Sequence, residues 1–299
     1  MRFLIVGAAD EYRSVVPSIP GCRLVGETSS SPSATSLRRE CDAVIVAMPL
    51  SQRAEVVRAA LVEGKSVLAE APLAEGPDES RALCELADAR RIPLHVTLPH
   101  RFEPPVARVL RWVQDGAIGP IVGLRAEVGS PHDHLATLDL ARLLLGEIVA
   151  CEAQETFALL RNAERVAAEV RRVDWVEGPI IDVLGQGGYL RLAMGPWLVS
   201  GKLANGRRVR HAHRRALLAE CWSRLRHGCS GALRRELTAF CAARSAEVPL
   251  ASGWDGCRLG EVLAALESSR WVDAEVPLRP LPVTPPSARK ANLVRGREE

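Results

Sequence analysis

The chain has 299 residues, more than one domain usually holds, so two domains with separate cores are expected. Hydrophobic residues make up 47% of the chain and charged residues 25%, and these proportions exclude the disordered and fibrous classes. The net charge of +3 is too small to indicate a nucleic-acid or membrane partner, so we expect neither.

The first part of the chain alternates short apolar runs with helical patterns, which is typical of βαβ units on a parallel sheet. Strands are predicted at residues 3–6, 24–25, 43–46, 66–68 and 94–96. Only about 13 residues separate Ser29 from Asp42, whereas a helix with its return strand needs about 30. We therefore predict a first domain over residues 1–118 whose sheet lacks one strand.

The second part opens after the turn at residues 116–120. A strand at 121–128 and a helix at 136–145 precede strand-like runs at 180–184, 188–193 and 197–203, then helices at 216–226, 232–243 and 257–270 and a strand near 275–278. The short connections predict an α+β domain over 119–282 with a largely antiparallel sheet. Residues 283–299, rich in Pro and Arg, are expected to form a C-terminal tail.

Cysteine usage and the lack of long apolar runs indicate a cytoplasmic protein. The eight cysteines are scattered without a CxxC pair, and we interpret them as buried thiols of a reducing compartment. The apolar start at 3–6 is too short for a signal peptide, and no run of about 20 apolar residues occurs. A basic stretch is interpreted as a solvated strand-to-helix connection rather than an anion site: Arg207, Arg208, Arg210, His211, His213, Arg214 and Arg215.

Short motifs follow one another in a distinctive order. Glu70-Ala71-Pro72-Leu73 follows a predicted strand, Arg101-Phe102-Glu103-Pro104 comes later in the first domain, and Leu138-Asp139-Leu140-Ala141-Arg142 lies on the helix after the turn. Val183-Leu184-Gly185 and Ser252-Gly253-Trp254-Asp255-Gly256 come later in the second half. This order resembles the glucose-fructose oxidoreductase and inositol dehydrogenase family (Gfo/Idh/MocA) along nearly the whole chain. The resemblance implies a truncated Rossmann-type parallel sheet domain followed by an α+β domain with an open, largely antiparallel sheet.

The cofactor-binding motif departs from the family pattern. The family's first turn is a GxGxxG loop, whose glycines let backbone amides approach the pyrophosphate of NAD or NADP. Here the turn is Gly7-Ala8-Ala9-Asp10-Glu11-Tyr12, so one glycine remains and two carboxylates would repel phosphate. NAD or NADP binding is therefore expected to be weak or absent. The resemblance places these residues along the cofactor edge: Gly7, Ala9, Ser29, Pro49, Arg53, Glu70 and Pro72.

Two of these positions leave alternatives open. Ser29 stands where the family has a ribose-binding carboxylate; with nearby arginines it could accept the extra phosphate of NADP, and the simpler interpretation is an exposed polar loop. The Arg53 guanidinium could clamp a carboxylate or phosphate of a substrate, or pair with Glu55 or Glu70 at the surface.

The catalytic positions are altered too. The resemblance places Ala71 where the family has a Lys that contacts the reacting hydroxyl, and Ala136 where it has a proton-shuttling His. The remaining candidates for catalysis are His100, His132, His134 and Asp139, in a cleft between the domains. The spacing of His132 and His134 would suit a metal, but a polar loop at a strand end is the preferred interpretation and no metal site is predicted.

Three functions remain open on this evidence. The first is NAD(P)H-dependent reduction of an imine or carbonyl of a small molecule in a biosynthetic pathway, because Thr137-Leu138-Asp139-Leu140 resembles the thiazolinyl imine reductase branch, which also lacks the Lys. The alternative is a non-redox protein that binds, converts or senses a small molecule and has lost its dinucleotide. The third is a purely structural role as a subunit partner. The resemblance also implies a homo-oligomer formed through the sheet of the second domain.

Overall fold

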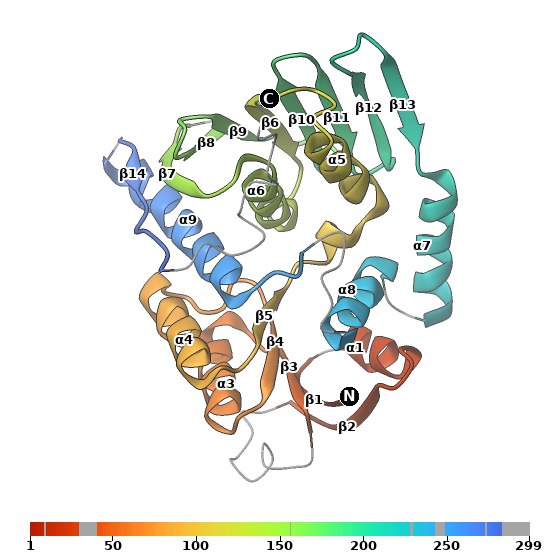
Figure 1. Cartoon of the computed structure of the whole chain (residues 1–299). Helices are drawn as coiled ribbons and strands as arrows, with labels where there is room; N and C mark the ends of the chain where they lie inside the picture. Colours follow the sequence, from red (N-terminus) through yellow and green to blue (C-terminus); the bar gives the residue numbers. More distant parts are fainter. Residues whose placement is uncertain are drawn as a thin grey trace, which may run out of the picture. The chain divides into compact units, whose positions relative to one another are not determined.

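The structure is a computed structural model that describes residues 1–8, 10–29, 41–155, 157–227, 230–242, 249–272 and 274–282 (Figure 1). The chain divides into two compact units, Met1–Phe102 with Leu218–Glu261 and Glu103–Leu217 with Val262–Glu299. This division differs from the boundary expected at residue 118. The predicted fold class, a parallel sheet domain followed by an α+β domain, is confirmed. The tail predicted at 283–299 lies outside the described residues.

The first unit is built on a parallel sheet, sheet A. Its strands are β1 (Arg2–Gly7), β2 (Arg23–Thr28), β3 (Ala43–Ala47), β4 (Ser66–Glu70) and β5 (Leu94–Thr97), in the order β2-β1-β3-β4-β5. All five residues of β3 are buried, as expected for a parallel strand covered on both faces. Helices α3 (Leu50–Val62) and α4 (Pro77–Arg90) connect neighbouring strands. Sheet A has five strands among the described residues; residues 30–40, on which the predicted loss of a strand depends, lie outside them.

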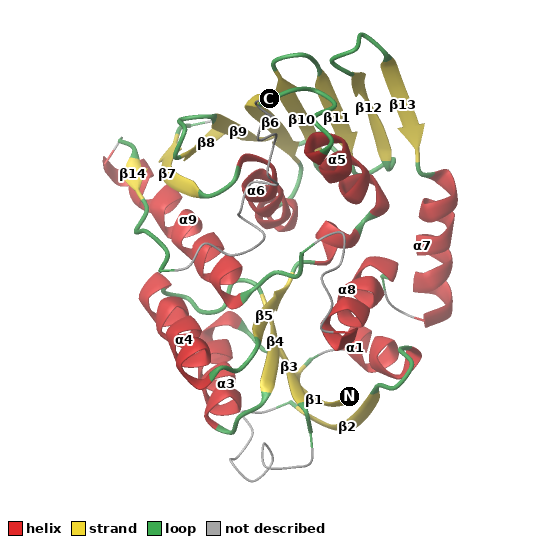
Figure 2. Ribbon diagram, viewed as in Figure 1, coloured by secondary structure: helices red, strands yellow, loops and turns green. Residues whose placement is uncertain are grey.

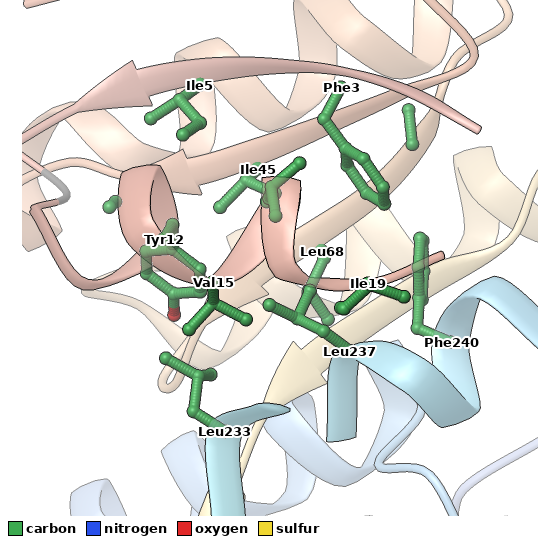
Figure 3. Close-up of a cluster of buried hydrophobic side chains, with 13 residues drawn as sticks. Phe3, Ile5, Tyr12, Val15, Ile19, Ile45, Leu68, Leu233, Leu237 and Phe240 are labelled. Carbon is green, nitrogen blue, oxygen red and sulfur yellow. The ribbon is translucent and has the colours of Figure 1, made fainter. Parts of the chain in front are cut away.

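One face of sheet A is covered by short N-terminal helices and by a segment that returns from late in the chain. Helix α1 (Asp10–Val15) and the 3₁₀ helix η1 (Val16–Ser18) follow β1, and α8 (Gly231–Ala242) packs beside them (Figure 3). Leu233, Leu237 and Phe240 of α8 join the hydrophobic cluster that includes Phe3 and Tyr12. Each such buried side chain contributes about 1.5–3 kcal/mol, which explains why this late segment belongs to the first unit rather than to the predicted second domain.

Sheet B organises the second unit (Figure 2). Its order is β13-β12-β11-β10-β6-β9-β8-β7-β14, and the β6–β9 pair is parallel while the other pairs are antiparallel, so the predicted largely antiparallel sheet is confirmed. Helices α5 (Pro104–Gln114) and α6 (Pro131–Leu145) pack on this sheet. The strands are β6 (Ile121–Val128), β7 (Ile148–Ala153), β8 (Phe157–Asn162), β9 (Ala167–Arg172), β10 (Ile180–Gly185), β11 (Tyr189–Ala193), β12 (Leu198–Lys202), β13 (Arg208–Ala212) and β14 (Val276–Pro277).

Three further elements complete the described chain: the 3₁₀ helix η2 (Pro99–Phe102) and the helices α7 (Arg214–His227) and α9 (Gly253–Val272). On α7, Leu218, Trp222 and Leu225 are exposed although they recur at helical spacing. Within the described residues, no helix is both long and apolar enough to cross a bilayer.

The cysteines are less uniformly buried than predicted. Among those described, Cys221 is exposed, Cys22 and Cys241 are half-buried, and the remaining four are buried: Cys41, Cys84, Cys151 and Cys257. The scattered sequence positions gave no sign of this difference.

Candidate functional site

The carboxyl ends of the parallel strands of sheet A meet at one edge of the first unit. The pairing register aligns Gly7 with Ala47, and Glu70 with Thr97. Loops that leave parallel strands at this edge are where ligands bind in folds of this type. The predicted cofactor residues of the first unit therefore lie along the expected edge, apart from Ala9, which lies outside the described residues.

Gly7 is required by the packing of the first turn. Its φ of 114° belongs to the region that favours glycine, and a side-chain carbon there would overlap the carbonyl oxygen of Ala47. The glycine that remains of the motif thus serves the contact between β1 and the end of β3. Its retention has a structural cause that is independent of any nucleotide.

Tyr12 stands at the position of the third glycine of the family motif and is buried. Its ring lies in the hydrophobic cluster (Figure 3). Its hydroxyl donates to Thr97 Oγ1 at 3.4 Å. Burial is the main cause that raises the pKa of this phenol well above its usual value. Tyr12 therefore ties α1 to the end of β5 as a neutral core residue.

The residues after β1 do not fit the pyrophosphate of a dinucleotide. Helix α1 has only six residues, so it offers a much smaller dipole than a full-length helix, and Asp10 and Glu11 occupy its first turn. Ser29, after β2, is exposed, and the nearby Glu27 carboxylate pairs with Arg13. A phosphate placed here would meet negative charge instead of a helix N-terminus free to bind it.

Arg53 occupies the centre of the edge as a buried hydrogen-bond donor. Its Nε and Nη2 donate to the carbonyl oxygen of Met48 at 3.2 and 2.9 Å, and Nη1 donates to the carbonyl of Pro72 at 2.6 Å. Nη2 also pairs with Glu70 Oε2 at 2.9 Å. The pairing with Glu70 expected at the surface thus has one buried member, since the Arg53 side chain is only 7% exposed. Its guanidinium joins the loops that follow β3 and β4. Pro49, directly before α3, is exposed.

Glu70 presents a carboxyl group with an altered pKa. Its side chain is 40% exposed and belongs to the last residue of β4. Desolvation raises the pKa of this carboxyl, Arg53 opposes that shift, and Glu11 adds to it. Glu70 can therefore exchange a proton at higher pH than an ordinary glutamate. A cis peptide bond joins the next two residues, Ala71 and Pro72.

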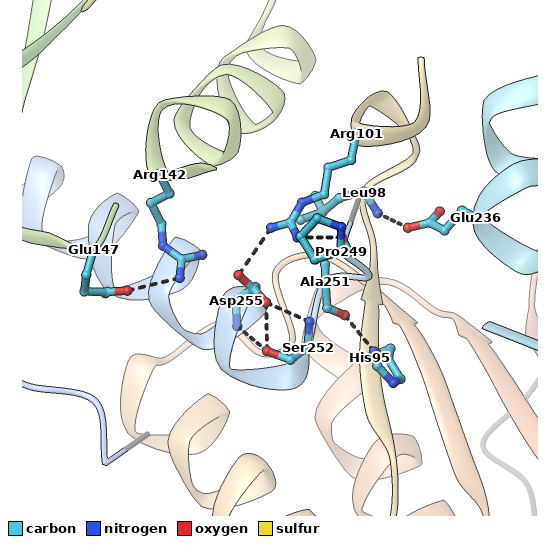
Figure 4. Close-up of polar contacts among 10 residues, drawn as sticks. All are labelled: His95, Leu98, Arg101, Arg142, Glu147, Glu236, Pro249, Ala251, Ser252 and Asp255. Carbon is cyan, nitrogen blue, oxygen red and sulfur yellow. Dashed lines mark hydrogen bonds and ion pairs between the residues drawn. The ribbon is translucent and has the colours of Figure 1, made fainter. Parts of the chain in front are cut away.

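A buried polar network, missed in the sequence, holds the segment after β5 (Figure 4). The Arg101 guanidinium is fully buried and donates to Asp255 Oδ1 at 3.3 Å. Asp255 Oδ2 also accepts from the backbone N and the Oγ of Ser252, both at 2.7 Å. Glu236 Oε1 on α8 accepts from the backbone N of Leu98 at 2.7 Å. Asp255 thus pairs with a buried charge and Glu236 with a buried backbone amide, and both of these groups would be costly to leave unpaired.

His100 lies within the segment that this network fixes. It is half-buried on η2, between the Leu98 amide and the buried Arg101. Arg235 Nε of α8 donates to the carbonyl of Phe102 at 2.8 Å, at the end of the same segment. His100 is thus carried on a short, well-anchored element of the first unit.

The second unit carries the other predicted catalytic residues on α6, which begins five residues earlier than predicted. Ser130 caps the helix, accepting from the backbone N of Asp133 at 3.1 Å, and its Oγ donates to Asp133 Oδ2 at 2.7 Å. The predicted polar loop is therefore the first turn of a helix. Asp133 thus takes part in the cap of this helix. The side chain of His132 lies outside those described.

His134 and Asp139 differ in their surroundings. His134 is half-buried, and burial first, then Arg270 and Arg172, lower the pKa of its imidazole. Asp139 is fully buried in the same helix. Among the described residues, no three His, Cys, Asp or Glu side chains gather as metal ligands. The candidate catalytic residues lie in both units, and the pocket predicted between them stays a prediction.

A cavity of about 180 Å³ lies within the second unit, between the ends of α5 and α6 and the turn after β8. Its lining is mainly apolar, and Asn162 at its rim is held by a hydrogen bond to the carbonyl of Leu145 at 2.8 Å. None of the predicted site residues lines it. No pattern in the sequence indicated this cavity.

Comparison with known proteins agrees with this architecture. Residues 4–98 match the model of the family described as an oxidoreductase family with an NAD-binding Rossmann fold, GFO_IDH_MocA. Levoglucosan dehydrogenase of Pseudarthrobacter phenanthrenivorans is 26% identical over 178 residues, which cover 46% of each chain. Inositol 2-dehydrogenase of Rhizobium meliloti is 24% identical over 48% of each chain. The matches thus span just under half the length of these relatives.

Solved structures show the same fold over most of the chain. An oxidoreductase from Agrobacterium radiobacter, crystallised with NAD⁺, L-tartaric acid and magnesium, superposes with a TM-score of 0.75 at 15% identity, covering 93% of this chain and 98% of that one. Residues 4–98 are thus similar in sequence to the Gfo/Idh/MocA oxidoreductase family, and the chain shares the fold of these solved oxidoreductases.

Proposed function

We propose that the protein is a non-redox member of this family, which binds or converts a small polar molecule and has lost its dinucleotide. The observation that carries this proposal is the turn after β1. There a six-residue helix begins with Asp10 and Glu11, and the Tyr12 side chain packs in the hydrophobic core. A pyrophosphate bound here would be repelled by the two carboxylates and would have to displace the packed ring of Tyr12.

The substituted catalytic positions support the same conclusion. Ala71 and Ala136 cannot exchange protons, and removing a general base from alcohol oxidation costs about 10²- to 10⁴-fold in rate. The positions that would hold and deprotonate a hydroxyl in the family are thus filled by methyl groups. Binding of a hydroxylated compound needs neither of them.

The proposed ligand is a small polyol or hydroxy acid. The relatives are named for levoglucosan and inositol, and one neighbour was crystallised with L-tartaric acid. Glu70 and His100 in the first unit and His134 in the second supply groups that could accept or donate hydrogen bonds to hydroxyls.

One observation favours a second function, the reduction of an imine or carbonyl in a biosynthetic pathway. Burial raises the pKa of Glu70, next to the position of the family's Lys, so its carboxyl could supply the proton that such a reduction consumes. The reductase also requires a dinucleotide, and the residues after β1 do not fit one. We therefore rank it second.

We further propose that the protein is a cytoplasmic homo-oligomer formed through sheet B. Asp182, Leu184 and Tyr189 alternate with the buried residues of β10 and β11 and so lie on the face opposite the buried one. Sedimentation of Leu184→Glu tests this interface, and Trp222→Glu on α7 tests the competing exposed surface. Dissociation by Trp222→Glu alone would contradict the sheet interface.

Ligand-induced stabilisation tests the proposed function. The unfolding temperature is measured with levoglucosan, myo-inositol and L-tartrate, each with and without NADPH. We expect one of them to raise it without nucleotide, since a ligand at 100 times its Kd contributes about 2.7 kcal/mol. Glu70→Gln and His134→Asn should remove the effect, whereas Arg58→Gln on the exposed side of α3 should keep it. Stabilisation that requires NADPH would favour the reductase.

A further inference from the structure

Two cysteines that are far apart in the sequence meet in the first unit. Cys22 and Cys241 are separated by 219 residues, yet their Sγ atoms lie 3.2 Å apart. Cys22 comes directly before β2, and Cys241 lies in the last turn of α8. Both side chains pack against the hydrophobic cluster and both stay half-buried. Each thiol is thus held in place by a regular element while keeping some access to solvent.

We infer that Cys22 and Cys241 form a reversible disulfide when the protein meets a small disulfide oxidant. A disulfide places its sulfur atoms about 2 Å apart, so the two sulfurs need to approach by only about 1 Å. Side-chain rotation and slight adjustment of the end of α8 can provide that approach. No movement of one unit against the other is involved, because both residues belong to the first unit.

The other described cysteines do not share this combination of proximity and access. Cys84 and Cys257 are also neighbours, and their mutual hydrogen bond together with burial raises the pKa of Cys84, but both are at most 2% exposed. Cys221 is exposed on α7. The chain therefore provides a buried pair and an exposed single thiol as internal comparisons.

The reaction is an exchange with an oxidant such as oxidised glutathione. One thiolate attacks the glutathione disulfide, forming a mixed disulfide and releasing one reduced glutathione; the second thiolate then attacks the protein-bound sulfur and releases the other. Two protein thiols are oxidised and one disulfide is reduced to two thiols. Burial and the hydrogen bond with Cys22 raise the pKa of Cys241. Either thiol can make the first attack, and the same disulfide results.

The bond would fix α8 on sheet A. Helix α8 also supplies Glu236 and Arg235, whose hydrogen bonds hold the segment that carries His100. Oxidation would therefore hold the segment that carries His100 more rigidly and would also stabilise the first unit. A closed loop of 219 residues is long, and cross-links of long loops restrict the unfolded chain most.

The test uses the full-length protein treated with oxidised glutathione in its folded state. Peptide mapping without reduction should yield a Cys22–Cys241 linked peptide, and the unfolding temperature should rise by about 5–15 °C and return after treatment with dithiothreitol. Cys22→Ser and Cys241→Ser should abolish both changes, whereas Cys221→Ser should keep them. Peptide mapping of the protein without substitutions tests the Cys22–Cys241 linkage even if a variant folds poorly. A stable glutathione adduct on Cys22, or linkage through Cys221 only, would overturn the inference.

Discussion

Replacing Arg53 by Met tests whether this arginine stabilises the fold or binds a ligand. The variant keeps a long apolar side chain but removes the donors that serve the carbonyl oxygens of Met48 and Pro72. Each buried acceptor that loses its partner costs about 1–3 kcal/mol. Glu70 is 40% exposed, so its carboxylate is rehydrated and adds little. We therefore expect a loss of about 2–6 kcal/mol in the free energy of unfolding.

Urea denaturation followed by circular dichroism measures this loss. The midpoint should fall while the m-value stays unchanged, because the surface exposed on unfolding is the same. Arg58→Met, on the exposed side of the same helix, is the matched control and should change stability by no more than about 0.5 kcal/mol. If Arg53→Met unfolds like the unmodified protein but loses small-molecule binding, the guanidinium is a ligand clamp and our account of it is refuted.

Three further predictions concern stability. Burial lowers the pKa of His213 from its ordinary 6.5 to about 4, so protonation favours the unfolded chain. The stabilisation that His213 contributes should be complete above pH 6.5 and should be lost as the pH falls toward 4. Unfolding of His213→Asn, measured across this pH range, should show a smaller loss of stability. Tyr12→Ala should cost about 3–5 kcal/mol in urea denaturation, whereas Tyr12→Phe should cost at most about 1; equal losses would contradict the core role of the ring. Asp255→Ala removes the carboxylate that faces the buried Arg101 and should cost about 3–5 kcal/mol by the same assay. A cost below about 1 kcal/mol would mean that the pair is dispensable.

The strands and helices that were predicted from local periodicity are present in the structure, whereas β7, β8, β9 and β13 were not predicted. The buried run 43–46 and the alternating runs of sheet B both appear as strands in the structure. The early start of α6 had a readable signal as well, since Ser130 followed three residues later by Asp133 is a capping pattern. Arg53 likewise shares the helical face of Val57 and Ala60, which are buried.

Other features depend on contacts between distant segments and leave no local trace. The return of α8 to the first unit depends on Leu233, Leu237 and Phe240 packing beneath Phe3. Cys22 and Cys241 meet for the same reason. Departures from a motif are readable in the sequence, but whether a substituted residue is buried, as Tyr12 is, depends on what packs around it.

Equilibrium titration with NADH and NADPH, followed by nicotinamide fluorescence, tests the central claim most directly. Levoglucosan dehydrogenase, which has been crystallised with NADH, serves as the positive control. We predict no saturation at nucleotide concentrations up to about 1 mM. A Kd at or above that concentration corresponds to a binding free energy of at most about 4 kcal/mol. Saturable binding of either nucleotide with a Kd in the low micromolar range would contradict the claim that the turn from Gly7 to Tyr12 has lost the dinucleotide.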